Sequence, residues 1–245
     1  MDALSGETRG APTLAEVSQA YDARFAQGDL QESQTFYRWV LRCLGPQPGA
    51  SLLDVSCGAG RLLSEAKARC QVHGSGIDIS SVALRFARRQ APASSLTRSD
   101  GVELPFREAA FDCITNLGSL EHYTDIPRGV QEMVRVLKPG GRAAILLPNS
   151  YYLGDILWLV WRTGRGPSHQ QRLERFATLV EWRELLEAGG FRLERAYPYN
   201  FRFPRTRADW RWYRRYPRKL LNLLLAPAVP FNLAYCFLFI VRKPA

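Results

Sequence analysis

The sequence predicts an α/β protein built on a doubly wound, mostly parallel sheet. Between Ala50 and about Asn149, short apolar runs of strand length alternate with stretches in which apolar residues recur at helical spacing. The first run, Leu52 to Val55, has the continuous apolar character of a strand buried on both faces. Alternation of this kind favours a sheet that helices cover on both sides.

Two helices are expected before the sheet. The first follows a cap at Thr13 and continues through Phe25, and the second spans Ser33 to Leu44. The segment Gly45-Pro46-Gln47-Pro48-Gly49 ends the second helix and acts as a linker. In the part that follows, strands are expected near residues 51–56, 74–79, 95–99, 110–116 and 142–148, and helices near 60–70, 81–90 and 126–137.

The regular pattern stops after Pro148. A very apolar stretch from Tyr151 to Trp161 and a glycine-containing loop come next. A helix capped at Thr178 follows, and a strand is expected near 191–199. The apolar run from Leu220 to Val241 is long enough to span a membrane, but the prolines within it favour a helix, a turn and a strand instead.

Composition narrows the class of protein. With 245 residues, 46% of them hydrophobic and 23% charged, the chain can bury a sizeable core. The five cysteines and three histidines have no metal-ligand spacing, so no metal is expected. No signal peptide is visible in residues 1–12, which favours a cytoplasmic protein. Much of the net charge of +10 comes from Arg192 to Lys219, which favours an anionic partner.

A strand, a glycine-rich turn and the start of a helix coincide at Asp54-Val55-Ser56-Cys57-Gly58-Ala59-Gly60. Gly58 and Gly60 let a ligand approach the backbone closely, and the free N–H groups of the new helix favour an anionic group. About twenty residues later Asp78 ends a second apolar run, where doubly wound folds place a carboxylate on ribose hydroxyls.

Three more motifs follow in order: Ser99-Asp100-Gly101, Phe111 to His122, and Val136-Leu137-Lys138-Pro139-Gly140-Gly141-Arg142. Together with the glycine-rich turn, this series resembles the class I S-adenosylmethionine-dependent methyltransferases, most closely the group that includes the ubiquinone and menaquinone methyltransferases. The resemblance covers roughly residues 15 to 150. It implies a Rossmann-like, seven-stranded sheet with an antiparallel last strand, for which residues 232–243 are suited, and S-adenosyl-L-methionine as cofactor.

The resemblance also implies how the chain is divided. Residues 1–49 would form N-terminal lid helices and 50–149 the cofactor-binding core. Residues 150–176 would be a cap insertion on the substrate side, because an insertion after the fifth strand lies over the carboxyl ends of the strands. Residues 177–245 would complete the sheet, with a basic and aromatic insertion at 201–230.

The methionine end of the cofactor is expected at the glycine-rich turn. On the resemblance, Gly58 and Gly60 line this end and Asp54 supports the loop. Asn116 and Leu117, at the end of the fourth strand, would face the reactive methyl group.

The adenosine end is expected further along the sheet edge. On the same resemblance, Asp78 takes the ribose hydroxyls and Ile79 packs on the adenine face. Asp100 and the backbone of Gly101 would read the adenine edge.

The segment Tyr21-Asp22-Ala23-Arg24-Phe25 resembles the N-terminal lid of small-molecule methyltransferases. There the tyrosine packs over the cofactor and the arginine can reach the methionine carboxylate, which implies these roles for Tyr21 and Arg24. The alternative is an amphipathic packing helix with an exposed Arg24.

The chain departs from the family pattern at Ser56, where the usual residue is glycine. The serine is expected to be tolerated in the cofactor loop, but it argues against a positive φ at this position. His122 is the titratable side chain close behind the fourth strand, and a neutral imidazole there could act as a general base. The alternative is a structural histidine.

The expected reaction is methyl transfer to a small-molecule, sugar or lipid-linked acceptor, with O-methylation favoured. Asn116-Leu117-Gly118-Ser119 lacks the Pro-Pro-aromatic set of enzymes that methylate nucleic acids at exocyclic amines, so a nucleic-acid partner is not favoured. Two alternatives stay open, a non-catalytic cofactor-fold protein and a nucleic-acid-binding protein that uses the arginine-aromatic segment. The same segment also allows peripheral contact with a membrane.

Overall fold

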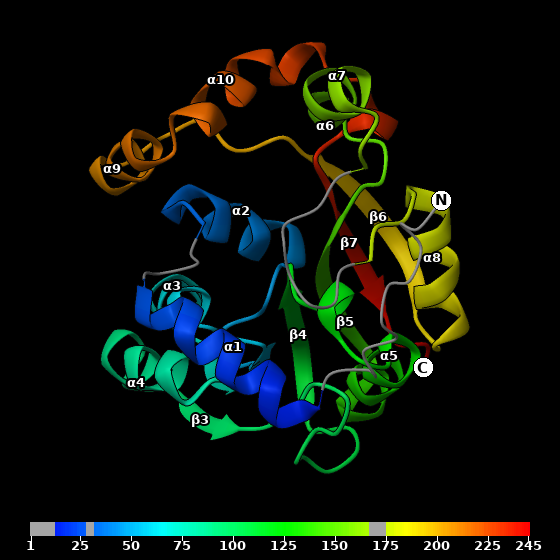
Figure 1. Ribbon diagram of the computed structural model, residues 1–245. Helices are drawn as coiled ribbons and strands as arrows, with labels where there is room; N and C mark the ends of the chain where they lie inside the picture. Colours follow the sequence, from blue (N-terminus) through cyan, green and yellow to red (C-terminus); the bar gives the residue numbers. More distant parts are fainter. Residues whose placement is uncertain (1–12, 28–31, 167–174) are drawn as a thin grey trace.

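Seven strands form one sheet in the order β3-β2-β1-β4-β5-β7-β6 (Figure 1). The computed structural model describes residues 13–27, 32–166 and 175–245. Six strands, β1 to β6, run in the same direction, and β7 runs antiparallel to both of its neighbours. The strands are β1 (Ser51–Val55), β2 (His73–Asp78), β3 (Ser95–Arg98), β4 (Phe111–Leu117), β5 (Leu137–Pro148), β6 (Arg192–Tyr199) and β7 (Cys236–Arg242). The predicted fold class is confirmed.

Helices cover both faces of the sheet, as the sequence predicts (Figure 1). One face is covered by α2 (Gln34–Leu44), α3 (Arg61–Cys70) and α4 (Ser81–Gln90), and the other by α5 (Ile126–Val136) and α8 (Leu179–Ala188). Side chains alternate between the faces along each strand. Leu53 of β1 therefore packs in the cluster with α5 and α8, while Leu52 packs in the cluster with α2 and α3.

Local capping explains several helix boundaries. The Ser33 hydroxyl accepts a hydrogen bond from the Phe36 N–H at the start of α2. Gly45 ends this helix with φ of 65° and donates its N–H to the Leu41 carbonyl. At the start of α8, Thr178 and Glu181 form a capping box.

Two boundaries differ from the prediction. β5 begins at Leu137, before the predicted residue 142, because Leu137 already pairs with Phe111 ahead of an irregularity in register. Gly140, with φ of 73°, allows the distorted backbone between the two paired parts. At the other end of the chain, the final strand begins only at Cys236, because residues 231–233 form a short 3₁₀ turn.

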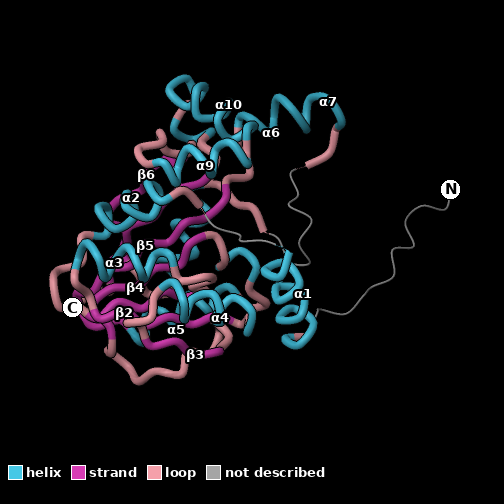
Figure 2. Tube along the Cα trace, turned by 90° about the vertical axis from the view of Figure 1, so that its left-hand side faces the viewer, coloured by secondary structure: helices cyan, strands magenta, loops and turns pink. Residues whose placement is uncertain are grey.

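The segments outside the sheet lie at its carboxyl edge. α1 (Leu14–Gln27) crosses the ends of the parallel strands, on the right in Figure 2. After β5 come α6 (Leu153–Asp155), a π-helical turn at 156–160 and α7 (Trp161–Thr163). After β6 come α9 (Arg207–Arg215), α10 (Pro217–Leu225) and a 3₁₀ turn at 226–228.

The predicted insertion 201–230 thus contains α9 and α10, and the predicted cap 150–176 contains α6 and α7. Residues 1–12 and 28–31 of the predicted lid and 167–174 of the cap lie outside the described residues. Among the described helices, none combines the length and the apolar character that a membrane span requires.

Candidate functional site

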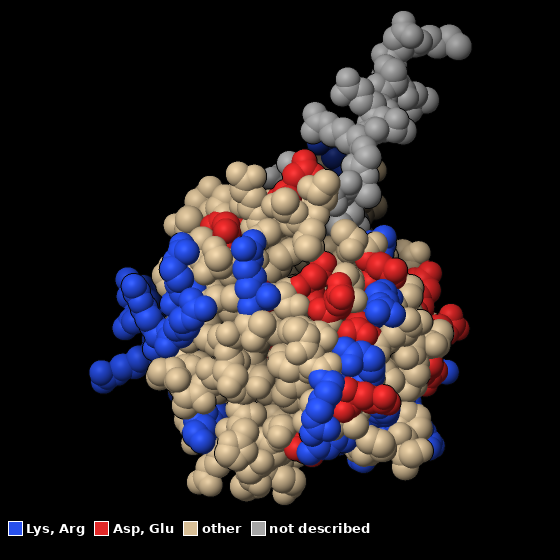
Figure 3. Space-filling model, turned by 90° about the horizontal axis from the view of Figure 1, so that it is seen from below, with Lys and Arg blue, Asp and Glu red and all other residues tan. Residues whose placement is uncertain are grey.

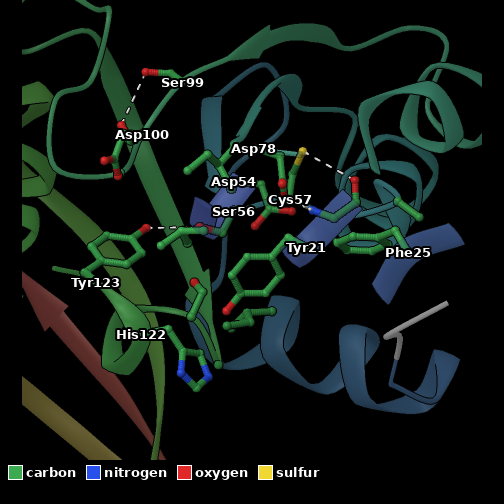
Figure 4. Close-up of a pocket in the computed structure, with 18 of the residues that line it drawn as sticks. Tyr21, Phe25, Asp54, Ser56, Cys57, Asp78, Ser99, Asp100, His122 and Tyr123 are labelled. Carbon is green, nitrogen blue, oxygen red and sulfur yellow. Dashed lines mark hydrogen bonds between the residues drawn. The ribbon is translucent and has the colours of Figure 1, made fainter. Parts of the chain in front are cut away.

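A pocket opens at the carboxyl ends of β1, β2 and β4, beneath α1 (Figure 4). Parallel doubly wound sheets bind ligands at this edge, near the point where the strand order reverses. Here the order reverses between β1 and β4. The labelled side chains form a series in Figure 4, with Ser99 and Asp100 at one end, Asp54, Ser56 and Asp78 in the middle, and His122 at the other end.

Asp22 fixes α1 over the pocket. Its carboxylate accepts hydrogen bonds from the Ser80 hydroxyl at 2.5 Å, the Ser81 hydroxyl at 3.2 Å and the Val82 N–H at 3.1 Å. It therefore caps the N-terminus of α4 from a different helix. Burial opposes the ionisation of Asp22, but these hydrogen bonds outweigh it, so that the pKa is lowered. α1 is thus attached to the wall of the pocket that it covers.

One face of α1 points into the pocket. Val17, Tyr21 and Phe25 recur at helical spacing, and all three line it. The Tyr21 ring lies across the middle of the pocket in Figure 4, and the Phe25 ring lies beside Cys57. A Cβ atom placed on Gly58 would be 3.5 Å from the Phe25 ring, so the lid touches the glycine-rich turn directly.

The glycine-rich turn uses positive φ angles at three positions. They are 63° at Ser56, 53° at Gly58 and 76° at Gly60. The expectation that serine argues against a positive φ at position 56 is therefore wrong. At Gly60 a side chain would be strained by the positive φ and tightly packed as well, because a Cβ atom would be 3.1 Å from the Ala87 Cβ on α4.

Asp78 holds the turn from the end of β2. One carboxylate oxygen accepts the Gly58 N–H at 2.8 Å, and the other accepts the Ser80 N–H at 2.8 Å. Burial raises the pKa of Asp78, and these two backbone donors oppose that rise. Since each carboxylate oxygen can accept a second hydrogen bond, Asp78 can bind ligand hydroxyls while it holds the loop.

Asp54 is a second buried carboxylate in the pocket wall. It is 4% exposed and accepts a hydrogen bond from the Thr115 hydroxyl at 2.7 Å. Burial raises the pKa of Asp54 to about 7; the Thr115 hydrogen bond opposes the rise and the nearby charge of Asp78 adds to it. A cation in the pocket would favour the ionised form.

The Tyr123 hydroxyl connects the glycine-rich turn to the end of β4. It lies 3.0 Å from the Ser56 hydroxyl and accepts a hydrogen bond from the Asn116 side-chain amide at 3.0 Å. The Asn116 side-chain carbonyl in turn accepts from the Ser119 hydroxyl and the Leu120 N–H. Burial raises the pKa of Tyr123, so its phenol stays protonated and can donate to Ser56.

The predicted adenine end of the pocket is also set by Tyr123. A Cβ atom on Gly101 would lie 2.1 Å from the Tyr123 hydroxyl, so only glycine fits against this ring. The carboxylate of the neighbouring Asp100 accepts the Val102 N–H at 3.2 Å, which fixes the turn after β3. Ile79, Ser99, Asp100 and Gly101 all line the pocket.

His122 lies at the other end, in the 3₁₀ turn after β4. Its side chain is 9% exposed, and its Nε2 atom is 3.7 Å from a carboxylate oxygen of Glu121. Leu117, Gly118 and Ser119 line the pocket beside His122.

Most of the predicted site residues come together in this pocket. The predicted site residues that line it are Tyr21, Asp54, Ser56, Gly58, Asp78, Ile79, Asp100, Gly101, Leu117 and His122. The other three predicted residues lie elsewhere among the described residues. Gly60 packs against α4, Asn116 is fully buried behind Tyr123, and Arg24 is on α1 but outside the lining.

Sequence reasoning missed Phe25, Tyr37, Arg61 and Tyr123, which also line the pocket. Phe25 follows Tyr21 by four residues on a helix, so the spacing alone could have found it. Arg61 begins α3 directly after the glycine-rich turn and brings a guanidinium to the end where a cofactor carboxylate is expected. Tyr123 has no comparable signal, because its position depends on the 3₁₀ turn.

The residues present fit S-adenosyl-L-methionine. Three carboxylates, Asp54, Asp78 and Asp100, line the pocket against one arginine, which suits a ligand with a cationic sulfonium and amino group. The turn offers free space above Gly58, with the Phe25 ring as the nearest neighbour. In the described part of the chain, no three His, Cys, Asp or Glu side chains are grouped in a way that could hold a metal ion.

Comparison with known proteins gives a consistent family. A methyltransferase domain model matches residues 53–145. The chain is 33% identical to a 2-phytyl-1,4-naphtoquinone methyltransferase of Nostoc sp., over 53% of this chain and 60% of that protein. It is 34% identical to a ubiquinone biosynthesis O-methyltransferase of Alkalilimnicola ehrlichii, over 59% and 62%. The chain thus spans about 60% of the length of these curated relatives.

A solved structure agrees in fold over nearly the whole chain. The crystal structure of the [4+2]-cyclase SpnF covers 96% of this chain and 97% of its own, with a TM-score of 0.69 and 21% sequence identity. A likeness at this level of identity shows the fold alone. Because a cyclase shares the fold, the reaction has to be argued from the residues of the site.

Proposed function

Because the chain belongs to the class I S-adenosylmethionine-dependent methyltransferase family, we propose that it transfers a methyl group to a small-molecule, sugar or lipid-linked acceptor. One observation carries the proposal. The lid helix α1 closes over a pocket with buried carboxylates in its wall, and His122 stands at the end away from Asp100.

Different residues of the pocket would bind different parts of the cofactor. Asp78 would bind the ribose hydroxyls, and Asp100 with the Gly101 backbone would bind the adenine, against Ile79. Gly58 and Arg61 would hold the methionine end. The cofactor itself supplies an electrophilic methyl group on a positively charged sulfur.

The protein's contribution to the chemistry is position and exclusion of water. Tyr21 and Phe25 of the lid, which line the pocket, would cover the cofactor, and Leu117 and Gly118 would form the wall where the acceptor meets the methyl group. Such confinement brings the acceptor atom in line with the methyl carbon and sulfur, which supplies much of the rate enhancement.

His122 would act as the general base. Its imidazole would accept the proton that a hydroxyl acceptor loses as the methyl group arrives. The Glu121 carboxylate at 3.7 Å would stabilise the imidazolium that forms. The alternative is a structural histidine, which the experiment below distinguishes.

A hydroxyl on a quinone-type ring is the acceptor we favour. The names of the two relatives refer to quinones, and one of them specifies O-methylation. A phenolic hydroxyl needs a base, which His122 provides, and its ring suits the apolar and aromatic wall of Leu117 and Tyr21.

The test uses S-adenosyl-L-methionine with a labelled methyl group and a panel of hydroquinones, sugars and glycolipids. We expect transfer of the label to at least one hydroxyl acceptor. His122→Ala should lower kcat about a hundredfold, flatten its rise with pH and leave cofactor affinity unchanged.

His73→Ala is the matched control, because His73 is exposed at the start of β2, away from the pocket. Cofactor binding without transfer to any acceptor would contradict the proposal and favour a non-catalytic protein. A His122 variant with normal turnover would make this residue structural.

A further inference from the structure

Two neighbouring helical segments at the carboxyl edge expose apolar side chains. In the segment from Leu153 to Thr163, Leu157 is 50% exposed, Trp158 59% and Trp161 81%. Residues at this spacing share one side of a helix. Helices on a globular protein normally turn their apolar side inward, so these three exposed side chains depart from the usual pattern.

α10 repeats this arrangement. Leu221, Leu224 and Leu225, again at helical spacing, are 50%, 68% and 50% exposed. Figures 1 and 2 both show α10 beside α6 and α7, beyond the ends of β5 and β7. We call the six exposed side chains of the two segments, Leu157, Trp158, Trp161, Leu221, Leu224 and Leu225, the apolar face.

Basic residues accompany this face. Residues 201–234 contain seven arginines and one lysine but only one acidic residue, Asp209. Asp209 is fully buried, where it accepts hydrogen bonds from Thr35 and from the Arg205 and Thr206 N–H groups. The charge next to the apolar face is therefore strongly positive.

The arginines that carry this charge are accessible. Arg211, Arg214 and Arg215 on α9, and Arg218 on α10, are exposed. The face seen in Figure 3, on the far side of the molecule from α10, carries basic and acidic side chains together. The positive excess near α10 is thus a local feature of the surface.

Three kinds of occupant could cover an apolar surface beside arginines. A second copy of the chain would bring its own arginines against these in a symmetric dimer, and like charges repel. A nucleic acid would satisfy the arginines but would leave the exposed leucines in water. An anionic lipid surface satisfies both, since tryptophan and leucine enter the interface and arginine pairs with headgroup phosphates.

We propose that the apolar face, with the arginines of α10 and of the adjoining α9, docks this protein on an anionic phospholipid membrane. Docking would present the carboxyl edge of the sheet, where the pocket opens, to acceptors held in the bilayer. The docking itself does not depend on the proposed methyl transfer, so each can be tested without the other.

The test is co-sedimentation of the purified chain with vesicles, without cofactor or acceptor. One set of vesicles contains equal parts of phosphatidylcholine and phosphatidylglycerol, and the other contains phosphatidylcholine alone. We expect binding to the first set, weaker binding to the second, and a decrease with added salt.

Two variants test the apolar face and the arginines of α9 separately. Trp158→Glu with Trp161→Glu should lower vesicle affinity at least about tenfold, because both side chains are removed from the interface. Arg211→Gln with Arg214→Gln and Arg215→Gln should lower it on the order of a hundredfold, at roughly a factor of five or more for each charge.

Matched controls lie elsewhere on the surface. Phe86→Glu on α4 and Val180→Glu on α8 replace exposed apolar residues away from the face, and Arg85, Arg88 and Arg89 on α4 provide a triple change to Gln. These variants should bind vesicles as the unchanged chain does. Cofactor titration should give the same affinity for all of them, which shows that each is folded.

Several results would overturn the proposal. One is absence of binding to phosphatidylglycerol vesicles; another is equal binding by the tryptophan variant and the unchanged chain. A dimer in analytical ultracentrifugation that dissociates on the tryptophan changes would identify a second copy as the occupant. Salt-sensitive binding to RNA or DNA that survives the tryptophan changes, with no vesicle binding, would identify a nucleic acid.

Discussion

The two parts of the carboxyl edge are built in opposite ways. At the pocket, Asp54 and Asp78 are buried and accept hydrogen bonds from the protein, Asp54 from the Thr115 hydroxyl and Asp78 from the Gly58 and Ser80 N–H groups. At the apolar face, Trp158 and Trp161 are exposed, and the neighbouring helix α10 (Figure 1) carries the exposed Arg218. The chain therefore places polar groups inside and apolar groups outside at the same edge of one sheet.

This difference predicts how substitutions in the two parts affect the fold and ligand binding. A buried carboxylate is costly unless each oxygen has a partner, so a substitution in the pocket disturbs the loops as well as the ligand. A substitution on an exposed face alters what binds there and leaves the fold intact. We therefore expect pocket variants to lose cofactor affinity and variants of the apolar face to keep it.

The largest effect should come from Asp78→Asn. The new amide cannot accept at both positions, so the Gly58 or Ser80 N–H loses its partner and the ribose hydroxyls lose a charged acceptor. Cofactor affinity should fall about a thousandfold, from two charge-assisted hydrogen bonds. Isothermal titration measures it, with Trp161→Ala on the apolar face as the control that should bind normally. Equal affinities for both variants would contradict the difference that we describe between the pocket and the apolar face.

Much of the pocket was predictable from sequence, because the residues that form it lie close together in the chain. The strand β1, the turn and the helix α3 are continuous in the chain, and Asp78 follows at the spacing that the crossover requires. The start of β5 was not predictable, because Leu137 pairs with Phe111 across a distortion that no local pattern marks. Strand pairing depends on residues far apart in the sequence.

Within the site, the unpredicted features depend on tertiary contacts. The role of Asp22 as a cap for α4 joins residues about sixty positions apart. Arg24 was assigned to the site by its resemblance to the family. The contacts of Asp22 with α4 decide which side of α1 faces the pocket. Tyr123 reaches Ser56 only because the 3₁₀ turn after β4 directs its ring back towards β1.

The second largest effect should be a pH dependence of stability that arises from the pocket. The pKa of Asp54 is raised to about 7 in the folded chain from 3.8, so the folded state holds a proton that the unfolded state has lost. Stability contributed by this group therefore falls as pH rises through this window, by about 1 kcal/mol between roughly pH 6 and 8.

Thermal unfolding across this pH range measures the effect of Asp54. We expect the unfolding temperature to fall with pH in the unchanged chain, and to fall less in Asp54→Asn, which cannot ionise. Because a cation favours the ionised carboxylate, stabilisation by S-adenosyl-L-methionine should be greater at the higher pH. Parallel curves for the two proteins would exclude Asp54 as the group that titrates.

The attachment of the lid should give a smaller effect. Asp22→Asn weakens the cap that joins α1 to α4, and cofactor affinity should fall about tenfold. Asp125→Asn is the matched control, because Asp125 caps its own helix, α5, and holds no lid. Since the pKa of Asp22 is lowered from 3.8, the ionised cap is present above that value and is lost as pH falls through the folded-state pKa.

The smallest effect concerns Ser56, where strain and a hydrogen bond oppose each other. A residue other than glycine at φ of 63° costs about 1 kcal/mol, and the hydrogen bond to Tyr123 contributes about as much. Ser56→Gly loses both terms, so its free energy of unfolding should change by less than about 0.5 kcal/mol. Ser56→Ala keeps the strain and loses the bond, so it should be destabilised by about 1 kcal/mol.

A double-mutant cycle decides whether this balance is real. In Tyr123→Phe the hydrogen bond is already absent, so Ser56→Ala should cost almost nothing further, and Ser56→Gly should stabilise the chain by about 1 kcal/mol. Tyr123→Phe also leaves the buried Asn116 amide without its acceptor, so that variant alone should be destabilised by roughly 1–3 kcal/mol. If Ser56→Ala has the same effect with and without the Tyr123 hydroxyl, the hydrogen bond does not offset the strain.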